Sequence, residues 1–328
     1  MDKLLTVSIA SYNVEAFLNK TLDSCIVPEV LDDLEIIIED DGSTDGTAAL
    51  AQEYVDKYPD SFRLIQKPNG GYGSTVNRSI KEATGKYFKL LDGDDWFDQN
   101  GLVELVNQLR MTDSDLYLNR YYSVTDGTGE SVLCKTDWAS YEGGTYSLDQ
   151  VHCEFPIGIW NTTVRTEAIR KSTYQLPEHQ FYTDQLFVIR FMPFIQTITF
   201  SQTPVYCYRI GRNGQSVSKE SRIKNYKNFL FVFREGLNLY KKASDAAPDN
   251  KRMMCSRNST YFYRALCSIL LMGPSKDRYE EMLALKNECK KLAPDVYQHA
   301  VKVSKKVKLL HYTAFQAYWF LAGKQETW

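Results

Sequence analysis

Three polar clusters follow short apolar segments in the first hundred residues, and two of them are rich in neighbouring carboxylates. The clusters are Ser11 to Asn13, Glu39 to Thr47 and Asp92 to Asp95. Adjacent aspartates repel one another unless a cation or the hydrogen-bond donors of a ligand offset their charge. A hard divalent cation, held by one or two carboxylates and by diphosphate oxygens, is the natural occupant. The pattern therefore predicts a site for a metal ion and a hydroxyl-rich ligand.

A second interpretation applies to the cluster at 39–47 when it is taken alone. Asp41, Ser43 and Asp45 are residue types that make turn and helix-cap hydrogen bonds without any ligand. The second acidic segment, Asp92 to Asp94, is expected at the same edge of the fold. Two such clusters at one edge favour the metal site over turn chemistry.

The segments that precede the clusters have the pattern of buried strands joined by helices. We predict strands over 4–10, 34–39, 62–66 and 87–91, and helices over 15–24, 44–58 and 74–83. This alternation is typical of a doubly wound, mainly parallel α/β sheet, which binds its ligand beyond the carboxyl ends of the strands. The three polar clusters are therefore expected on one edge of the sheet.

The rest of the chain divides into a mixed region and a helical region. A helix is predicted over 100–109, and loops with short strands follow it. Further helices are predicted over 223–241, 252–272, 276–292 and 296–320, separated by Pro248, Pro274 and Pro294. We therefore predict two domains, an α/β domain over 1–220 and a helical region over 221–328.

Composition and charge exclude several classes of protein. A net charge of −2 gives no indication of nucleic-acid binding. The seven cysteines are scattered and form no C-x-x-C pair, which argues against a disulfide framework or a zinc site and fits a reducing cytoplasm. The apolar run near the start is too short for a signal peptide, and no run approaches the roughly 18 apolar residues of a membrane-spanning helix. We expect a cytoplasmic protein.

Five segments, in order, resemble the inverting glycosyltransferases of family 2, which have the GT-A fold. They are Val7 to Asn13 (VSIASYN), Ile36 to Thr47 (IIIEDDGSTDGT), Asn69 to Ile80 (NGGYGSTVNRSI), Ala83 to Tyr87 (ATGKY) and Leu91 to Trp96 (LDGDDW). The resemblance covers residues 4–220. It implies transfer of a sugar from a UDP-sugar donor to an acceptor hydroxyl, with Mg²⁺ or Mn²⁺ as cofactor.

The resemblance also implies roles for individual residues in donor binding. Tyr12 would flank the base, Asp41 would bind a base nitrogen of uracil, and Asp92 would contact the ribose side of the donor. Asp94 would ligate the metal ion that bridges the diphosphate. The predicted nucleotide-sugar site is completed by Ala10, Gly70, Gly71, Asn77 and Gly93.

A general base is implied at Asp184, within the segment FYTDQLF at 181–187. The family carries a Glu-Asp pair here, and in this chain Thr183 replaces the Glu. Asp184 would take the proton of the acceptor hydroxyl as it attacks the anomeric carbon from the face opposite UDP, so that the configuration inverts. The alternative is that Asp184 begins a helix and only satisfies backbone N–H groups.

Arg209 and Arg212 lie in a segment that resembles the loop closing over the diphosphate in this family. The fork of a guanidinium matches phosphate oxygens. The glycine-rich spacing fits an ordinary surface loop as well, and both interpretations stay open. Trp160 and His152 are candidates for the acceptor pocket, with burial in the core as the alternative.

The chain ends in a basic and aromatic segment between residues 302 and 320. Its members are Lys302, Lys305, Lys306 and Lys308, followed by Leu309, Leu310, Tyr312, Phe315, Tyr318, Trp319 and Phe320. Such a segment can lie on the anionic inner face of a cell membrane, or its aromatic rings can pack on other helices or on a second subunit of a homo-oligomer. The membrane interpretation favours a glycan or lipid-linked acceptor in the synthesis of a bacterial cell-surface polysaccharide.

Two other functions are compatible with part of the pattern. A catalytically silent UDP-sugar-binding or partner module would keep the fold, but the intact Asp92, Asp94 and Asp184 argue against it. A nucleotidyltransferase would carry a glycine-rich basic loop after the first strand, where this chain has Ser11 to Asn13.

Overall fold

The computed structural model describes residues 3–136, 138–141, 143–152, 157–212, 214–216 and 218–324. The chain forms two compact units. The first unit comprises Met1–Gln180 and Phe194–Arg212, and the second comprises Phe181–Pro193 and Asn213–Trp328. The segment that carries Asp184 therefore belongs with the C-terminal helices. The division of function between 1–220 and 221–328 stays a prediction.

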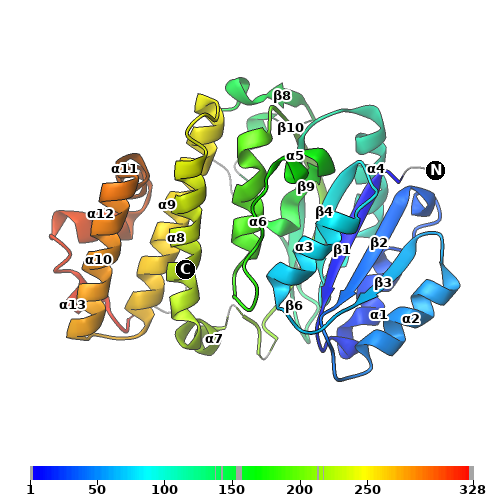
Figure 1. Cartoon of the computed structure of the whole chain (residues 1–328), viewed down its shortest axis with the longest axis horizontal. Coiled ribbons are helices and arrows are strands. Elements are labelled where there is room, and N and C mark those ends of the chain that lie inside the picture. Colours follow the sequence, from blue (N-terminus) through cyan, green and yellow to red (C-terminus); the bar gives the residue numbers. More distant parts are fainter. Residues whose placement is uncertain are drawn as a thin grey trace. The chain divides into compact units, whose positions relative to one another are not determined.

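A large sheet forms the centre of the first unit, with the strand order β3-β2-β1-β4-β9-β6-β10-β5. The strands are β1 Leu5–Ser11, β2 Leu34–Asp40, β3 Phe62–Gln66, β4 Tyr87–Asp92, β5 Trp96–Phe97, β6 Leu116–Thr125, β7 Ser131–Leu133, β8 Thr145–Ser147, β9 Thr162–Arg165 and β10 Thr197–Ile210. Strands β1 to β4 run parallel and side by side (Figure 1), which confirms the four predicted strands. Beyond β4 the sheet is mixed, because β9 is antiparallel to both β4 and β6.

Helices cover both faces of the parallel strands. They are α1 Glu15–Ser24, α2 Thr47–Lys57, α3 Tyr72–Glu82, α4 Gln99–Met111 and α5 Thr166–Lys171. On one face the alternate residues Leu5, Val7 and Ile9 of β1 pack with buried leucines of α1 and α4. Helix α3 packs on β1 and β2 and contacts α5. The alternation of apolar residues along β1 thus sets which face of the sheet packs against α1 and α4.

Helix α2 begins at Thr47, three residues later than predicted. The reason is local, because the backbone N–H of Thr44 donates to Asn13 Oδ1 at 2.8 Å and that of Gly46 donates to Glu15 Oε2 at 2.8 Å. Because these two N–H groups bond to the neighbouring loop, the segment 44–46 stays outside the helix.

The second unit is helical. Its helices are α6 Asp184–Phe191, α7 Lys219–Lys224, α8 Tyr226–Lys242, α9 Pro248–Leu271, α10 Lys276–Leu292, α11 Pro294–Val303, α12 Lys305–Tyr312 and α13 Tyr318–Leu321. Helices α8 and α9 run alongside each other (Figure 1), with Phe233 and Phe262 in contact at 5.3 Å between ring centroids. Prolines occupy the first turn of α9 and of α11, where a missing N–H costs nothing. Short 3₁₀ helices across the chain lie at Leu31–Asp33, Ala139–Tyr141, Leu148–Gln150, Ile159–Asn161 and Met192–Phe194.

Two long predicted helices, over 223–241 and 296–320, are wrong in their continuity. The first is interrupted at Asn225. The second is interrupted at Ser304, whose backbone is extended and whose Oγ caps α12 by accepting the N–H of Val307 at 3.3 Å. It ends again at Tyr312, and the backbone then turns at Ala314 and Phe315, where φ is +49° and +68°. Among the helices within 3–324 that the structure describes, none is long and apolar enough to cross a membrane.

Candidate functional site

The three polar clusters meet at one edge of the sheet. Strand register places Ser11 beside Asp40 on one side of β1, and Ala10 beside Asp92 on the other side. Because the strands are parallel, their carboxyl ends coincide. The sequence prediction that the clusters share one edge is confirmed.

The first two loops are held together by hydrogen bonds from side chains. The N–H of Asn13 donates to Ser43 Oγ at 3.0 Å, and the N–H of Val14 donates to Thr47 Oγ1 at 2.9 Å. Asn13 has φ of +52°, a conformation that asparagine tolerates better than most residues. Its neighbour Tyr12 is 51% exposed, so the ring is free to face a ligand. The turn-and-cap interpretation of this cluster therefore describes a real part of its chemistry.

Asp41 closes the glycine-rich loop that precedes α3. Its carboxylate accepts the N–H of Gly70 at 2.9 Å and that of Gly71 at 2.8 Å, and it forms an ion pair with Lys67. Gly71 has φ of +80°, and a Cβ there would lie 3.1 Å from the backbone nitrogen of His179. The glycine-rich loop is therefore held in place by hydrogen bonds to one buried carboxylate. Contact of Asp41 with a base stays a prediction.

A segment that the sequence did not single out, Leu176–Gln180, crosses over the glycine loop; we call it the strap. The N–H of His179 donates to the carbonyl of Gly70 at 2.7 Å. The side-chain amide of Asn77 accepts the backbone N–H of Leu176 and donates to its C=O, at 2.9 Å each. Asn77 therefore fixes the strap, and its predicted contact with the donor stays a prediction. Gly73 is the residue in the sequence that could have indicated the strap, because a Cβ there would overlap the carbonyl of Pro177.

The acidic cluster after β4 is held in place by buried hydrogen bonds. Gly93 donates its N–H to the carbonyl of Ala10 at 3.1 Å, and a Cβ at Gly93 would lie 2.9 Å from that oxygen. Asp95 is 1% exposed and accepts the Tyr206 hydroxyl at 2.6 Å and the Arg209 N–H at 2.7 Å. Burial, and then the charges of the two aspartates before it, raise the pKa of Asp95 well above its ordinary value.

Tyr206 is a second buried residue that holds the acidic cluster in place. Its hydroxyl also accepts the backbone N–H of Asp92 at 3.2 Å, so one buried oxygen joins two members of the acidic cluster. Burial and the charge of Asp95 raise the pKa of Tyr206. Sequence analysis missed Tyr206, since nothing local relates it to a cluster more than a hundred positions earlier.

Arg209 and Arg212 both reach the acidic cluster. Arg212 Nη2 lies 2.7 Å from Asp94 Oδ2, and Arg209 Nε donates to the carbonyl of Asp94 at 2.8 Å. Arg209 also pairs with Asp126 at 2.7 Å. Both guanidiniums lie over the ring of Phe17, at 4.8 and 4.9 Å from its centroid. These contacts favour the site interpretation of the two arginines over that of an ordinary surface loop.

The donor set fits a metal ion that is held mostly by its substrate. No three His, Cys, Asp or Glu side chains come together as a metal cage in the part of the chain that the structure describes. Asp94 is partly exposed, with 17% of its side chain accessible, so its carboxylate is within reach of an incoming ion. One or two carboxylates completed by diphosphate oxygens is the usual mode for Mg²⁺.

A buried lysine lies beneath this edge. Lys89 of β4 is fully buried and donates to the carbonyl of Thr162 at 3.1 Å, and burial lowers its pKa to about 7. Trp160 stacks on Tyr208 with 5.6 Å between ring centroids, which fits the core interpretation, and its acceptor role stays a prediction. His152 is exposed, so burial in the core is wrong for this residue.

Asp184 lies in the second unit, as the first residue of α6. The residue is half-buried, and burial of its carboxyl raises its pKa, opposed by the charges of Arg264 and Arg257 and by the N–H of Gln185. Before it, Tyr182 has φ of +64° and stacks on Phe229 with ring centroids 3.9 Å apart. A carboxylate with a raised pKa suits a general base. The helix-start alternative is also present in the geometry, since the backbone N–H groups of Gln185 and of Asp184 itself bond this carboxylate.

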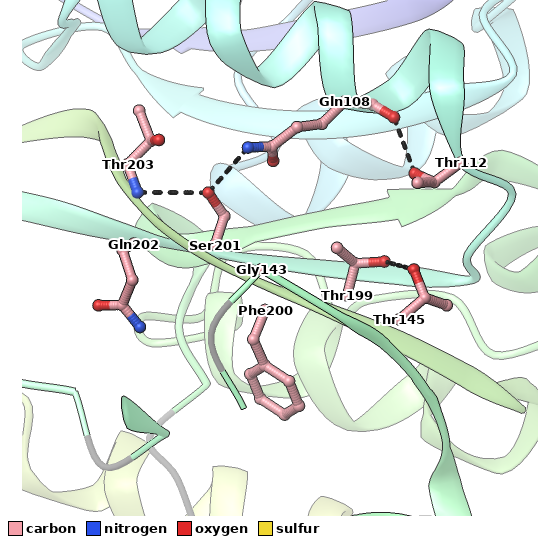
Figure 2. A pocket seen from close by; sticks show the side chains of 9 residues that line it. All are labelled: Gln108, Thr112, Gly143, Thr145, Thr199, Phe200, Ser201, Gln202 and Thr203. Atoms are coloured by element: carbon pink, nitrogen blue, oxygen red, sulfur yellow. Dashed lines mark hydrogen bonds between the residues drawn. The ribbon is translucent and has the colours of Figure 1, made fainter. Parts of the chain in front are cut away.

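A pocket of about 380 Å³ lies elsewhere in the first unit, near the start of β10 (Figure 2). It is lined by Gln108, Thr112, Gly143, Thr145, Thr199, Phe200, Ser201, Gln202 and Thr203. Ser201 Oγ accepts from Gln108 Nε2 at 3.1 Å, whereas Gln108 Oε1 and both amide atoms of Gln202 make no hydrogen bond within the described residues. The lining includes no predicted site residue, and the donor site at the strand ends stays a prediction.

Comparison with known proteins identifies the family of this chain. The sequence profile described as glycosyl transferase family 2 matches residues 6–197. The chain is 26% identical to "Putative glycosyltransferase EpsH" of Bacillus subtilis over 76% of this chain and 70% of that protein. It is 27% identical to "Cholesterol galactosyltransferase" of Borreliella burgdorferi over 68% of each protein.

Solved structures are similar over nearly the whole chain. S. aureus TarS 1–349, in complex with UDP-GlcNAc, has a TM-score of 0.69 at 19% identity, covering 98% of this chain and 90% of that one. The mannosyltransferase PcManGT of Pyrobaculum calidifontis, in complex with GDP-Man and Mn²⁺, has a TM-score of 0.53 at 16% identity, covering 99% and 87% of the two chains. The predicted GT-A sheet followed by a helical region is confirmed.

Proposed function

Since this chain belongs to glycosyl transferase family 2, we propose that it moves a sugar from a UDP-sugar donor to an acceptor hydroxyl, with inversion at the anomeric carbon. The observation that carries the proposal is the register that places Ala10 beside Asp92 and Ser11 beside Asp40. It gathers the base-side and diphosphate-side residues at the end of the sheet where such folds bind ligands.

The donor site is assigned to the first unit. Tyr12 and Asp41 read the uracil, and Asp92, with the backbone of Ala10 and of Gly93, takes the ribose side. Asp94 holds Mg²⁺ or Mn²⁺, which would supply positive charge to the diphosphate. Arg209 and Arg212 exchange part of their contact with Asp94 for the diphosphate oxygens, because a guanidinium binds phosphate as well as carboxylate. The UDP and UDP-GlcNAc complexes of TarS support this choice of donor.

The chemical step is a single displacement. A bond forms between the acceptor oxygen and the anomeric carbon while the bond from that carbon to the UDP oxygen breaks, and the electron pair leaves with UDP. The acceptor proton passes to Asp184, whose raised pKa favours accepting it. One carboxylate base is enough for this reaction.

The acceptor is assigned to a glycan or lipid-linked molecule, in the synthesis of a bacterial cell-surface polysaccharide. A peripheral membrane contact through residues 302–320 belongs to this proposal. It is supported by four exposed side chains, Leu309, Tyr312, Trp319 and Phe320, which are 44 to 73% exposed, beside the exposed Lys305 and Lys308. Flotation with anionic vesicles tests it, and dimerisation without vesicle binding would favour the homo-oligomer instead.

The first experiment is calorimetric titration of UDP with Mn²⁺ and then with EDTA. We expect metal-dependent binding that is lost in Asp94→Ala and kept in the control Asp113→Ala, whose side chain is 73% exposed and pairs with Lys86. Asp184→Asn should keep UDP binding and lose transfer by at least about 10²-fold. Absence of UDP binding by the folded wild type refutes the donor assignment, and binding without turnover on a UDP-sugar panel favours the silent module.

A further inference from the structure

The pocket near the start of β10 has a neutral, polar lining. Of the nine described residues that line it, none is charged, five are threonine or serine, and two are glutamine. Hydroxyl and amide groups each offer a hydrogen-bond donor and an acceptor. The volume of about 380 Å³ lies within the range of about 300–1,000 Å³ that is usual for small-molecule sites. The pocket therefore suits a neutral ligand that both donates and accepts hydrogen bonds.

Two amides of this lining have unused hydrogen-bonding capacity. Gln108 Nε2 donates to Ser201 Oγ at 3.1 Å, but Gln108 Oε1 has no partner among the described residues. Gln202 is half-buried, and neither its Nε2 nor its Oε1 bonds to any described residue. A buried amide without a partner destabilises a fold, so its presence calls for an explanation. A ligand of the pocket can supply these hydrogen bonds.

The pocket opens along the edge of β10 that faces away from β6. On this side β8 pairs with residues 197–199 of β10 and β5 pairs with residues 206–207, and no described strand pairs with residues 200–205. The side chains of Ser201 and Gln202 point to opposite sides of the strand, and both line the pocket (Figure 2). Side chains from both sides of the strand are thus available at this edge.

Aromatic packing makes the floor of the pocket rigid. Phe200 is fully buried, and its ring contacts those of Trp138, Tyr141 and Tyr146 with 5.2 to 6.1 Å between centroids. The hydroxyl of Thr145 is fixed as well, by a hydrogen bond with Thr199 at 2.7 Å. A rigid lining loses little conformational entropy when a ligand binds.

The chemistry of the lining favours a sugar over an ion or a peptide. An ion would find no opposite charge among the described lining residues. A peptide strand would not pair well with this edge, because the register of β10 with β6 shifts between Phe200 and Tyr206 and Pro204 has no N–H to donate. A sugar unit is uncharged, and its neighbouring hydroxyls can donate to and accept from side-chain amides and hydroxyls.

The pocket is separate from the predicted donor site. The acidic cluster bonds to β10 through Tyr206 and Arg209. The pocket is lined by residues 199–203, nearer the start of the same strand. Five residues of strand separate Ser201 from Tyr206, which is roughly 15 Å. A ligand in the pocket is therefore not the sugar that reacts at the acidic cluster.

We propose that this pocket binds a neutral sugar unit of a glycan, away from the site of transfer. Gln108 and Gln202 supply their unused amide groups, and Thr145 and Thr203 supply hydroxyls. The inference goes beyond the proposed function and does not depend on the donor assignment. If the proposed function also holds, an acceptor long enough to reach both sites binds more tightly than a short one.

The test is saturation-transfer difference NMR on the full chain without metal. The probes are the methyl glycosides of glucose, galactose and N-acetylglucosamine, with methyl glucuronoside as the charged counterpart of the glucoside. We expect at least one neutral glycoside to bind the wild type and the glucuronoside not to bind. Gln202→Leu, which removes the amide, and Thr145→Trp, which fills the pocket, should each weaken that binding at least about tenfold. Gln52→Leu, at an exposed position of α2, is the control and should leave it unchanged.

Thermal unfolding separates a role in binding from a role in folding. Gln202→Leu should melt at or above the temperature of the wild type, because an apolar group of similar size replaces an unsatisfied amide. A lower melting temperature with unchanged sugar affinity would overturn the site and assign Gln202 to the fold. Because Thr145 is exposed, its variant keeps the test valid should Gln202→Leu fail to fold.

Three other results would also overturn the site. They are no binding of any neutral glycoside by the wild type, equal binding of the glucuronoside, and wild-type affinity in both pocket variants. Titration of UDP with Mn²⁺ is independent of these results and should give the same affinity in the wild type and in both pocket variants. A wild type that fails to bind UDP refutes the donor assignment and leaves the sugar pocket standing.

Discussion

Replacing Tyr206 by phenylalanine removes one buried hydroxyl and keeps the ring, which packs edge-on against Phe97 at 6.2 Å. The hydroxyl donates to Asp95 at 2.6 Å and accepts the Asp92 N–H at 3.2 Å. Water cannot easily replace it, because Tyr206 is fully buried and Asp95 is 1% exposed. Both partners therefore lose their hydrogen bond to this hydroxyl in the variant, and among the described residues Asp95 keeps only the one from the Arg209 N–H.

The size of the effect follows from the two groups left unsatisfied. Each costs about 1–3 kcal/mol, so we expect a loss of about 2–6 kcal/mol in the free energy of unfolding. For a unit of this size 1 kcal/mol corresponds to about 2–4 °C, which gives a melting temperature lower by roughly 4–24 °C. The affinity for UDP with Mn²⁺ should fall as well, because the segment of Asp92 and Asp94 loses the buried hydrogen bonds that position it.

Thermal unfolding followed by circular dichroism in EDTA measures the stability term without any contribution from metal. Tyr122→Phe is the control, since Tyr122 is half-buried on β6 and its hydroxyl makes no hydrogen bond within the described residues. A Tyr206→Phe protein that melts with the control, and binds UDP as tightly as the wild type, would refute the reasoning.

Three further predictions concern buried charge and backbone strain. Lys89 has a pKa of about 7 in the fold and 10.5 as its ordinary value, so the unfolded chain binds more protons between those pH values and the wild type gains stability as pH rises through them. Lys89→Met should therefore be the more stable protein by a few kcal/mol at pH 7, with the difference vanishing near pH 10 in urea titrations; a difference that does not change with pH would contradict this. Burial raises the pKa of Glu39 from 4.5 to about 7, so the fold binds more protons between those values and the wild type loses up to about 3 kcal/mol as pH rises through them. Glu39→Gln should abolish that part of the pH dependence, and an unchanged slope between pH 4.5 and 7 would count against a buried neutral Glu39. Gly71→Ala should lower stability and UDP affinity more than Gly129→Ala, because both glycines have positive φ but only Gly71 has the strap within 4 Å; equal losses on thermal unfolding would show that strain alone matters.

The parallel half of the sheet was predictable because its information is local. Strand β1 alternates the apolar Leu5, Val7 and Ile9 with small residues and ends in the polar segment Ser11 to Asn13, so pattern and loop appear together in the sequence. The acidic edge followed in the same way, since parallel strands share their carboxyl ends. The helix ends were less predictable. Ser304, the N-cap of α12, divides a run of helix-forming residues.

The supports of the site depended on long-range contacts. Tyr206 and Asp95 are 111 residues apart, and Asn77 and Leu176 are 99 residues apart. Neither pair has a composition or a spacing that marks it, and only the folded sheet brings the partners together. Arg212 was named for its chemistry, but its partner in the fold, Asp94, is a contact that no pattern in the sequence indicated.

The strap has a consequence for the order of substrate addition. It bonds Gly70, whose own N–H binds Asp41, and the chain reaches Asp184 only four residues after the strap ends at Gln180. We expect a donor that changes the hydrogen bonds of Asp41 to act, through two peptide units and this short covalent tether, on the segment that leads to Asp184, the proposed base. We therefore expect compulsory-order kinetics in which the donor nucleotide binds before the acceptor and UDP leaves last.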